Sequence, residues 1–249
     1  FDFMTRSLQT HIEERVQAER LVILGTMAAG IAHEVRNPLE AIRGAAQVIE
    51  GCGGDATLRK FTRIIKEEVT ELDRFLEGFL RFARPPPLRI ESVALNDLIE
   101  DVVALLDPLC GDHGVTLVRQ LDGSLPQISA DAHQIKQVLM NLCLNAIQSM
   151  PDGGTLTLMT KAEARDGEGI ALTVRDTGSG MNETIRQKIF EPFVTTKEGG
   201  SGLGLAVCRS IVERHGGQIG LTAGEAQGTT FTVWLPMTGG GTEIAKQLA

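Results

Sequence analysis

The chain has 249 residues, of which 42% are hydrophobic and 22% are charged, and its formal net charge at pH 7 is -8. A chain of this length and hydrophobicity can bury a core, which excludes an intrinsically disordered protein and favours two domains of ordinary size. The negative charge argues against nucleic acid as a partner, because binding to that backbone depends on clustered Lys and Arg side chains.

Two long amphipathic helices are predicted at the start of the chain. Apolar residues recur at spacings of three and four from Leu24 to Ile49, and a second apolar stripe runs from Leu58 to Phe82. The run Arg84-Pro85-Pro86-Pro87 stops the second helix, since proline cannot continue a helix. Two helices cannot close a core alone, so we predict an all-α hairpin over residues 1–83 that forms a four-helix bundle in a homodimer. A Pro-rich linker is predicted over residues 84–90.

The first helix carries a histidine on the side opposite its apolar seam. With Ile31 at heptad position d and Val35 at a, His33 falls at position f and should face solvent. A neutral imidazole is a nucleophile near physiological pH, and a carboxylate such as that of Glu34 can fix its tautomer and raise its basicity. Asn37 lies one turn later on the same face, where its amide can orient a water.

A proline beside this histidine favours a functional interpretation. An exposed histidine on a helix usually needs no function. Here the run His33-Glu34-Val35-Arg36-Asn37-Pro38-Leu39 places a proline inside a long helix. That placement costs about 3 kcal/mol, which packing alone does not explain.

Mixed helices and strands follow the prolines. Helices are predicted over residues 95–109, 132–150 and 203–215, and strands over residues 115–119, 155–158, 170–174, 218–222 and 229–235. This order predicts an α+β sandwich over residues 91–237, with helices on one face of a sheet. Residues 238–249 match no pattern and are predicted to form a flexible tail.

Three segments of this second domain have groups suited to a nucleotide. Asn141 and Asn145 recur on one face of an otherwise apolar helix, and amide oxygens are hard ligands suited to Mg²⁺. Asp176 follows a predicted strand, and its carboxylate can accept from an exocyclic amine such as that of adenine. The glycine-rich run from Gly199 to Leu205 opens the next helix, whose free backbone amides favour phosphate.

Each of these segments has a simpler explanation when taken alone. A polar helix stripe is more often solvated, and Asp-Thr-Gly also occurs in turns and in aspartic proteases, although no second copy or flap is apparent here. The glycine-rich run is not a Rossmann fingerprint, because no βαβ unit with a trailing acidic residue surrounds it. It is not a P-loop either, because Gly-Lys-Ser/Thr is missing.

The motifs taken in order resemble one family. The run from His33 to Leu39, preceded by that from Leu24 to Gly30, resembles the phosphoacceptor box of sensor histidine kinases, particularly the nitrogen-regulation type. The later motifs resemble the N, G1, F and G2 boxes and the closing strand of the histidine kinase ATP-binding domain, which is similar to that of gyrase, Hsp90 and MutL. These are residues 141–146, 176–181, 190–193, 200–205 and 228–231.

The resemblance implies a fold and roles for the phosphoacceptor residues. The fold would be the dimerisation hairpin followed by a Bergerat-type (GHKL) ATP-binding domain. His33 would be phosphorylated, Glu34 would act as its base, and Asn37 would help water attack the phosphate of a response regulator.

The resemblance also implies the contacts of ATP and Mg²⁺. Asp176 would accept a hydrogen bond from adenine, Asn145 and Asn141 would bind the metal, and Thr230 would support the adenine site. Residues 190–197 would form a mobile lid. The remaining nucleotide contacts would come from Gly178, Gly180, Met181, Lys197, Gly202, Leu203, Gly204 and Leu205. Many relatives carry Lys or Arg shortly after the second Asn, but this chain has Ile147-Gln148, which leaves one phosphate contact unassigned.

We therefore expect a histidine kinase core that phosphorylates His33 and passes the phosphoryl group to a response regulator aspartate, with phosphatase activity on that regulator. An ATPase of the gyrase and Hsp90 type is one alternative. It would need a water-activating Glu on the helix over residues 132–150, which has none. A scaffold without turnover is the other, and the intact motifs argue against it.

The cysteines and the length of the apolar stretches indicate where in the cell the chain is expected. The four cysteines lie far apart with no Cys-x-x-Cys, which argues against zinc and favours reduced, buried thiols. No stretch approaches the roughly 20 apolar residues that cross a bilayer, and no signal peptide is apparent. We expect a cytoplasmic chain without a membrane segment, either by itself or as the cytoplasmic part of a membrane-bound sensor.

Overall fold

The structure, a computed structural model, describes residues 28–51, 55–83, 85–165, 167–197, 202–223 and 228–237. These residues form two compact units. The first contains the described residues up to Pro86 together with those of the segment 197–203, and the second contains the others.

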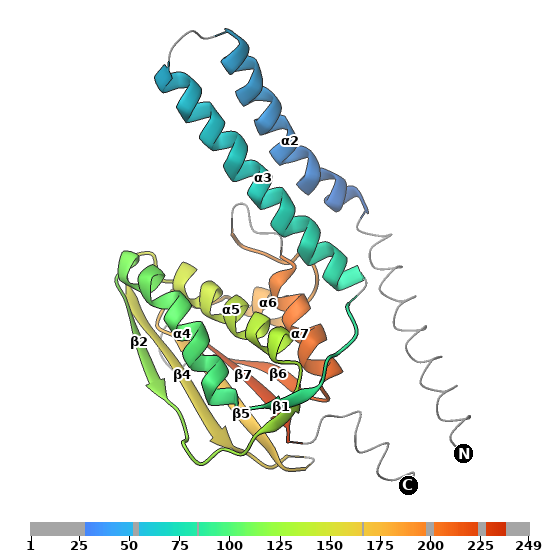
Figure 1. Cartoon of the computed structure of the whole chain (residues 1–249), viewed down its shortest axis with the longest axis vertical. Helices are drawn as coiled ribbons and strands as arrows, with labels where there is room; N and C mark the ends of the chain where they lie inside the picture. Colours follow the sequence, from blue (N-terminus) through green and yellow to red (C-terminus); the bar gives the residue numbers. More distant parts are fainter. Residues whose placement is uncertain are drawn as a thin grey trace, which may run out of the picture. The chain divides into compact units, whose positions relative to one another are not determined.

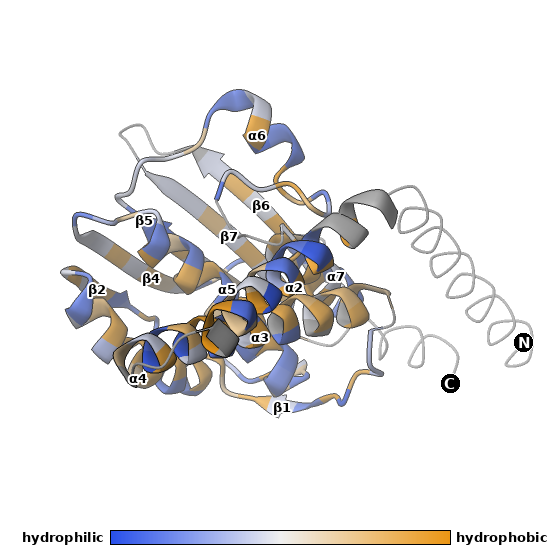
Figure 2. Cartoon of the chain, turned by 90° about the horizontal axis from the view of Figure 1, so that it is seen from above, coloured by the Kyte–Doolittle hydropathy of each residue, from blue (hydrophilic) through white to orange (hydrophobic). Residues whose placement is uncertain are grey.

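The first unit is built from two helices, α2 (Ala28–Gly51) and α3 (Asp55–Ala83), which pack against each other (Figure 1). Both helices carry hydrophobic and hydrophilic residues along their length (Figure 2), as expected for amphipathic helices. Large apolar side chains are exposed on this unit. They are Leu39, Val48, Leu58, Val69, Leu76 and Leu80.

The second unit has helices on one face of a mixed sheet (Figure 1). The sheet has five strands in the order β2-β4-β5-β7-β6, with β2 and β4 parallel and the other pairs antiparallel. The strands are β2 (Val115–Gln120), β4 (Gly154–Ala162), β5 (Gly169–Asp176), β6 (Gln218–Ala223) and β7 (Thr229–Pro236). The covering helices are α4 (Leu95–Asp112), α5 (Ala132–Gln148) and α7 (Gly204–Arg214). The predicted α+β sandwich is confirmed.

The core lies between the sheet and these helices. Strand residues alternate, so that Leu156 and Leu158 are buried while their neighbours are partly exposed, as expected for a sheet with one covered face. The helices contribute Ile99 and Leu139, whose side chains have no exposed surface. Each fully buried side chain of this kind contributes about 1.5–3 kcal/mol to stability. The core holds the strand ends in place, and the candidate site is built on them.

Two small features were not predicted from the sequence. A two-stranded antiparallel sheet joins β1 (Glu91–Val93) to β3 (Ile128–Ala130), and a short helix, α6 (Glu183–Lys188), follows β5. Strands of three residues are too short to give an alternating pattern. The short sheet matters because β3 leads directly into α5.

No helix among the described residues is both long enough and apolar enough to cross a membrane. The three cysteines that the structure describes, Cys110, Cys143 and Cys208, are buried and unbridged, as predicted. Cys52 lies outside the described residues.

Candidate functional site

Helix α2 carries the predicted phosphoacceptor residues. The backbone of His33 lies within this helix, but its side chain is outside the part that the structure describes. Glu34 is partly exposed and Asn37 is exposed, whereas Pro38 is buried. Helix α2 continues through Pro38, which has no N–H to donate to the carbonyl of Glu34. The carbonyl of Glu34, the neighbour of His33, therefore has no helical N–H donor four residues later.

The carboxylate of Asp176 is fixed at the end of β5. Asp176 is buried, and its Oδ1 accepts hydrogen bonds from the backbone amides of Gly178 at 2.8 Å and Thr229 at 3.1 Å. Two donors on one oxygen set the orientation of the carboxyl group. The group is thus held where a strand, a glycine turn and the first residue of β7 meet.

The structure favours Thr229 over Thr230 beside Asp176. Thr230 pairs with Arg175 in the β5–β7 register and points away from the helices. Thr229 is 4% exposed and shares the covered face of the sheet with Phe231 and Val233. The geometry therefore favours Thr229 over the predicted Thr230, and the alternation of apolar residues along β7 is the signal that could have found Thr229.

The glycine turn after β5 packs tightly on the end of α5. A side chain at Gly178 would bring a Cβ atom to 2.5 Å from the backbone oxygen of Ser149. The amide of Ser179 donates to that same oxygen at 3.2 Å, and Gly180 has a φ of 71°, a conformation that favours glycine. Gly178 and Gly180, predicted as nucleotide contacts, are thus needed for the shape of the turn.

Helix α5 and the start of α7 meet at Asn141. The Asn141 Nδ2 donates to the backbone oxygen of Gly204 at 3.4 Å and lies 3.6 Å from the Cys208 Sγ. These contacts orient the Asn141 amide. Asn141 and Asn145 are both partly exposed and lie one turn apart on α5, where their oxygens can face a ligand.

The predicted phosphate loop is described only in part. Gly202 has a φ of 63°, and Gly204 is the first residue of α7, so the backbone amides of Gly204 and Leu205 belong to a helix N-terminus, which favours anions. Leu203 is buried and Lys197 is exposed. Residues 198–201 lie outside the described residues.

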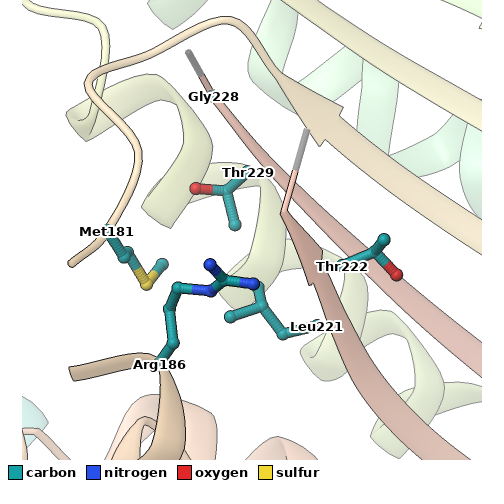
Figure 3. A pocket seen from close by; sticks show the side chains of 6 residues that line it. All are labelled: Met181, Arg186, Leu221, Thr222, Gly228 and Thr229. Atoms are coloured by element: carbon teal, nitrogen blue, oxygen red, sulfur yellow. The ribbon is translucent and has the colours of Figure 1, made fainter. Parts of the chain in front are cut away.

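A small pocket opens beside Thr229 (Figure 3). Its lining residues come from the turn after β5, from α6, and from β6 and β7. They are Met181, Arg186, Leu221, Thr222, Gly228 and Thr229. The guanidinium of Arg186 reaches toward Thr229 and Leu221 in Figure 3. Met181 was predicted as a site residue, whereas no sequence signal singled out Arg186.

The segment after α6 is attached to the sheet by an aromatic contact. Phe190 and Phe231 meet edge to face, with ring centroids 6.3 Å apart, which is a favoured aromatic geometry. Phe193 has a φ of 64°, which is uncommon for a residue with a side chain. The start of the predicted lid is therefore packed, and its mobility stays a prediction.

The donor atoms of the site restrict how a metal can bind. No group of three or more His, Cys, Asp or Glu residues in the described ranges could hold a metal ion. A cation here would be held by the amide oxygens of Asn141 and Asn145 together with phosphates and water, which is an arrangement that suits Mg²⁺.

Two segments of the chain match family models of known proteins. Residues 130–239 match the family model described as "Histidine kinase-, DNA gyrase B-, and HSP90-like ATPase", and residues 23–87 match the "His Kinase A (phospho-acceptor) domain". The sensor histidine kinase ZraS of Escherichia coli (strain K12) is 38% identical over 235 residues, which are 93% of this chain and 50% of ZraS.

Two solved structures are also similar. Histidine kinase ThkA, in a crystal structure with response regulator protein TrrA, matches with a TM-score of 0.80 and 32% identity over 93% of this chain and 67% of that chain. Full-length ShkA in complex with AMPPNP matches with a TM-score of 0.65 and 28% identity over 85% of this chain and 45% of that chain. The chain spans about half the length of ZraS.

Proposed function

The chain belongs to the sensor histidine kinases, and we propose that it uses ATP to phosphorylate His33 and then passes the phosphoryl group to an aspartate of a response regulator. One structural observation supports the proposed ATP site. Asp176 is fixed by two backbone amides within the domain where Asn141 meets Gly204 at the start of α7. The metal, the adenine and the phosphates thus each have a candidate partner in the motif from which that contact was predicted.

The proposed reaction is an in-line phosphoryl transfer, in which the nucleophile attacks the phosphorus opposite the leaving group. A bond forms between an imidazole nitrogen of His33 and the γ-phosphorus, and the bond from that phosphorus to the β–γ bridging oxygen of ATP breaks, releasing ADP. The imidazole proton goes to Glu34, the neighbouring residue of α2. Such reactions depend on positioning and charge neutralisation more than on covalent help.

We assign the metal and the phosphates to neighbouring groups. The amide oxygens of Asn145 and Asn141 would hold Mg²⁺, which neutralises phosphate charge when it is bound. The backbone amides at the start of α7 and the side chain of Lys197 would contact the phosphates. Thr229, rather than Thr230, would support Asp176 at the adenine ring.

The first unit would provide dimerisation and regulator docking. Exposed apolar side chains on α2 and α3 are what a second copy would cover in a four-helix bundle. ThkA was crystallised with a response regulator, and a receiver domain is the partner that we propose here. Asn37 would orient water for dephosphorylation of that regulator. The nitrogen-regulation subtype, the domain boundaries and the cytoplasmic location stay predictions.

An ATPase of the gyrase type is less well supported by the structure. Helix α5 carries no carboxylate that could activate water, since its sequence from Ala132 to Gln148 contains neither Asp nor Glu. Asp131 precedes that helix, but its carboxylate already accepts from Arg89 and Gln134. A histidine is therefore favoured over an activated water as the acceptor of the phosphoryl group.

One assay tests the proposed function. The chain is incubated with ATP labelled on the γ-phosphate, with Mg²⁺ or with excess EDTA. We expect Mg²⁺-dependent label on the protein that acid removes and base does not, as for a phosphorylated histidine. Release of labelled inorganic phosphate without labelled protein would support hydrolysis instead.

A further inference from the structure

A buried carboxylate joins three distant segments of the second unit. Asp131 caps α5, because its Oδ1 accepts from the backbone amide of Gln134 at 3.0 Å. Its Oδ2 accepts from the backbone amide of Arg89 at 2.9 Å and from the Gln134 Nε2 at 3.1 Å. Its own backbone amide donates to the Nε2 of His215 at 3.0 Å. Asp131 is 6% exposed, so these bonds are largely shielded from water.

The hydrogen bonds of Asp131 with Arg89, Gln134 and His215 form what we call the junction. The histidine of this junction is held in one neutral tautomer. His215 directly follows α7 and is 2% exposed. Its Nδ1 lies 2.8 Å from the backbone oxygen of Ile211, to which it donates, and its Nε2 accepts from Asp131. Burial lowers the pKa of His215 below its ordinary value. The imidazole is therefore a fixed acceptor that ties the end of α7 to the start of α5.

The junction lies at one end of a helix pair whose other end carries the nucleotide contacts. Helices α5 and α7 pack against each other. Asp131 and Gln134 contact the end of α7, where the Arg214 Nη1 donates to the Gln134 Oε1 at 3.3 Å. Further along α5, Asn141 contacts the start of α7. The helices are thus antiparallel, and polar contacts run along their interface from the linker to the proposed metal site.

Arg89 belongs to the predicted linker, yet it is bonded to this junction. The Pro-rich linker is predicted over residues 84–90, and the second unit of the structure begins at Pro87. Arg89 is bonded to Asp131 two residues before β1, which pairs with β3. The point at which the linker leaves the catalytic unit is therefore fixed by Asp131.

We propose that Asp131 and His215 are positioning residues that fasten the linker to the α5–α7 pair and so set how fast bound nucleotide reaches His33. This inference rests on the proposed function, because the nucleotide and His33 are assigned to separate units. A reaction between groups on separate units depends on their effective concentration and alignment, both of which a loosened linker reduces. Nucleotide contacts are made elsewhere, so affinity should be spared.

Two substitutions remove the same hydrogen bond from opposite sides. Asp131→Ser keeps a good helix cap for Gln134 but has one oxygen and a shorter reach. Arg89→Pro removes the amide that donates to Asp131 and leaves the carboxylate in place. Asp122→Asn is the matched control, because Asp122 also accepts from a backbone amide, that of Ser124, within an exposed turn.

The experiment measures three quantities on the full chain. They are the dissociation constant for ATP, the autophosphorylation rate at saturating ATP, and hydrogen exchange in a peptide covering residues 87–93. Hydrogen exchange should be about tenfold faster over residues 89–93 in Asp131→Ser and over residues 90–93 in Arg89→Pro, which has no amide hydrogen at position 89. Each variant should autophosphorylate about tenfold more slowly, with ATP affinity within about twofold of the parent. The Asp131→Ser, Arg89→Pro double variant should be no slower than the worse single one.

The outcomes separate this proposal from the proposed function. Unchanged exchange at residues 87–93 in both variants would overturn the fastening role, whether or not the parent chain is a kinase. Faster exchange with an unchanged rate, additive losses in the double variant, or equal losses in Asp122→Asn would overturn the positioning role. Loss of folding in Asp131→Ser leaves Arg89→Pro as the deciding variant. A parent chain without autophosphorylation would contradict the proposed function.

Discussion

The Oδ1 of Asp176 accepts a hydrogen bond from the backbone amide of Thr229 across 3.1 Å, which joins the end of β5 to the start of β7. Because Gly178 donates to the same oxygen, the carboxylate cannot turn without breaking two bonds. Because the carboxylate is already fixed, binding a ligand costs little conformational entropy at this side chain. The carboxylate therefore favours ligands whose hydrogen-bond donors match its position. The side chain of Thr229 lies on the same covered face of the sheet.

This geometry predicts different effects for two adjacent threonines. Thr229→Ala removes a hydroxyl beside Asp176 and should weaken ATP binding about tenfold, which corresponds to about 1.4 kcal/mol. Thr230→Ala changes the opposite face of β7 and should leave the affinity within about twofold. Calorimetric titration with ATP and Mg²⁺ measures both constants. A larger loss in Thr230→Ala would restore the sequence-based assignment.

The difference between these threonines illustrates what the sequence could and could not predict. The hairpin and the sandwich followed from periodicity and glycine placement, and the order of the motifs from the resemblance to histidine kinases. The alternation of apolar residues along β7 could have separated Thr229 from Thr230, but placing Thr229 beside Asp176 required the register of β7 against β5, which depends on pairing between distant segments. The junction at Asp131 was missed for the same reason, since Arg89 and His215 are 42 and 84 residues away from it in sequence.

The close packing of the turn after β5 predicts a stability effect at Gly178. In Gly178→Ala the new Cβ would press on Ser149, and we expect a loss of about 1–3 kcal/mol together with weaker ATP binding, because the turn holds Asp176. Gly220→Ala is the control, since its Cβ would have nothing within 4 Å. Urea unfolding followed by circular dichroism measures the stabilities. Equal losses in the two variants would contradict this explanation.

The junction also predicts loss of stability in acid. Burial lowers the pKa of His215 from its ordinary 6.5, so below about pH 6.5 the unfolded chain takes up a proton that the folded chain does not. Burial alone would raise the pKa of Asp131, but hydrogen bonds from Arg89 and Gln134 lower it below 3.8, and its contribution is lost below about pH 4. Both groups therefore make stability rise with pH.

Unfolding measured between pH 5 and pH 8 tests the contribution of histidine. The parent chain should be less stable at about pH 5.5 than at about pH 7.5, and His215→Leu should show a smaller dependence over that range while being less stable overall, because the Asp131 amide loses its acceptor. The exposed His133 provides the control variant His133→Leu, which should retain the parental slope. An identical slope in His215→Leu would contradict the assignment.

Replacing the proposed phosphoacceptor should separate chemistry from binding. In His33→Ala we expect no autophosphorylation and ATP affinity within about twofold of the parent, because His33 and Asp176 belong to different units. His133→Ala, at an exposed position of α5, should keep the phosphorylated product. Labelled ATP and calorimetry give the two readings, and label retained on His33→Ala would mean that another residue is the acceptor.

Asn37 should separate kinase from phosphatase activity. Its exposed amide lies one turn from His33 on α2, where a docked receiver domain would bring its phosphoaspartate. Transfer from ATP needs His33 and Glu34, whereas dephosphorylation needs a water held against that phosphate. Loss of the hydrogen bond that orients this water should cost about 2–4 kcal/mol in the barrier, by analogy with removal of a transition-state donor.

The test compares Asn37→Ala with Gln47→Ala, which removes another exposed amide further along the same helix. Asn37→Ala should autophosphorylate at a rate close to that of the parent but dephosphorylate the cognate regulator about 30- to 1000-fold more slowly, which is the range that the barrier change predicts. Gln47→Ala should keep both activities, because its amide is not beside the phosphorylated residue. If Asn37→Ala dephosphorylates the regulator as fast as the parent chain, or cannot autophosphorylate, water positioning by Asn37 is wrong.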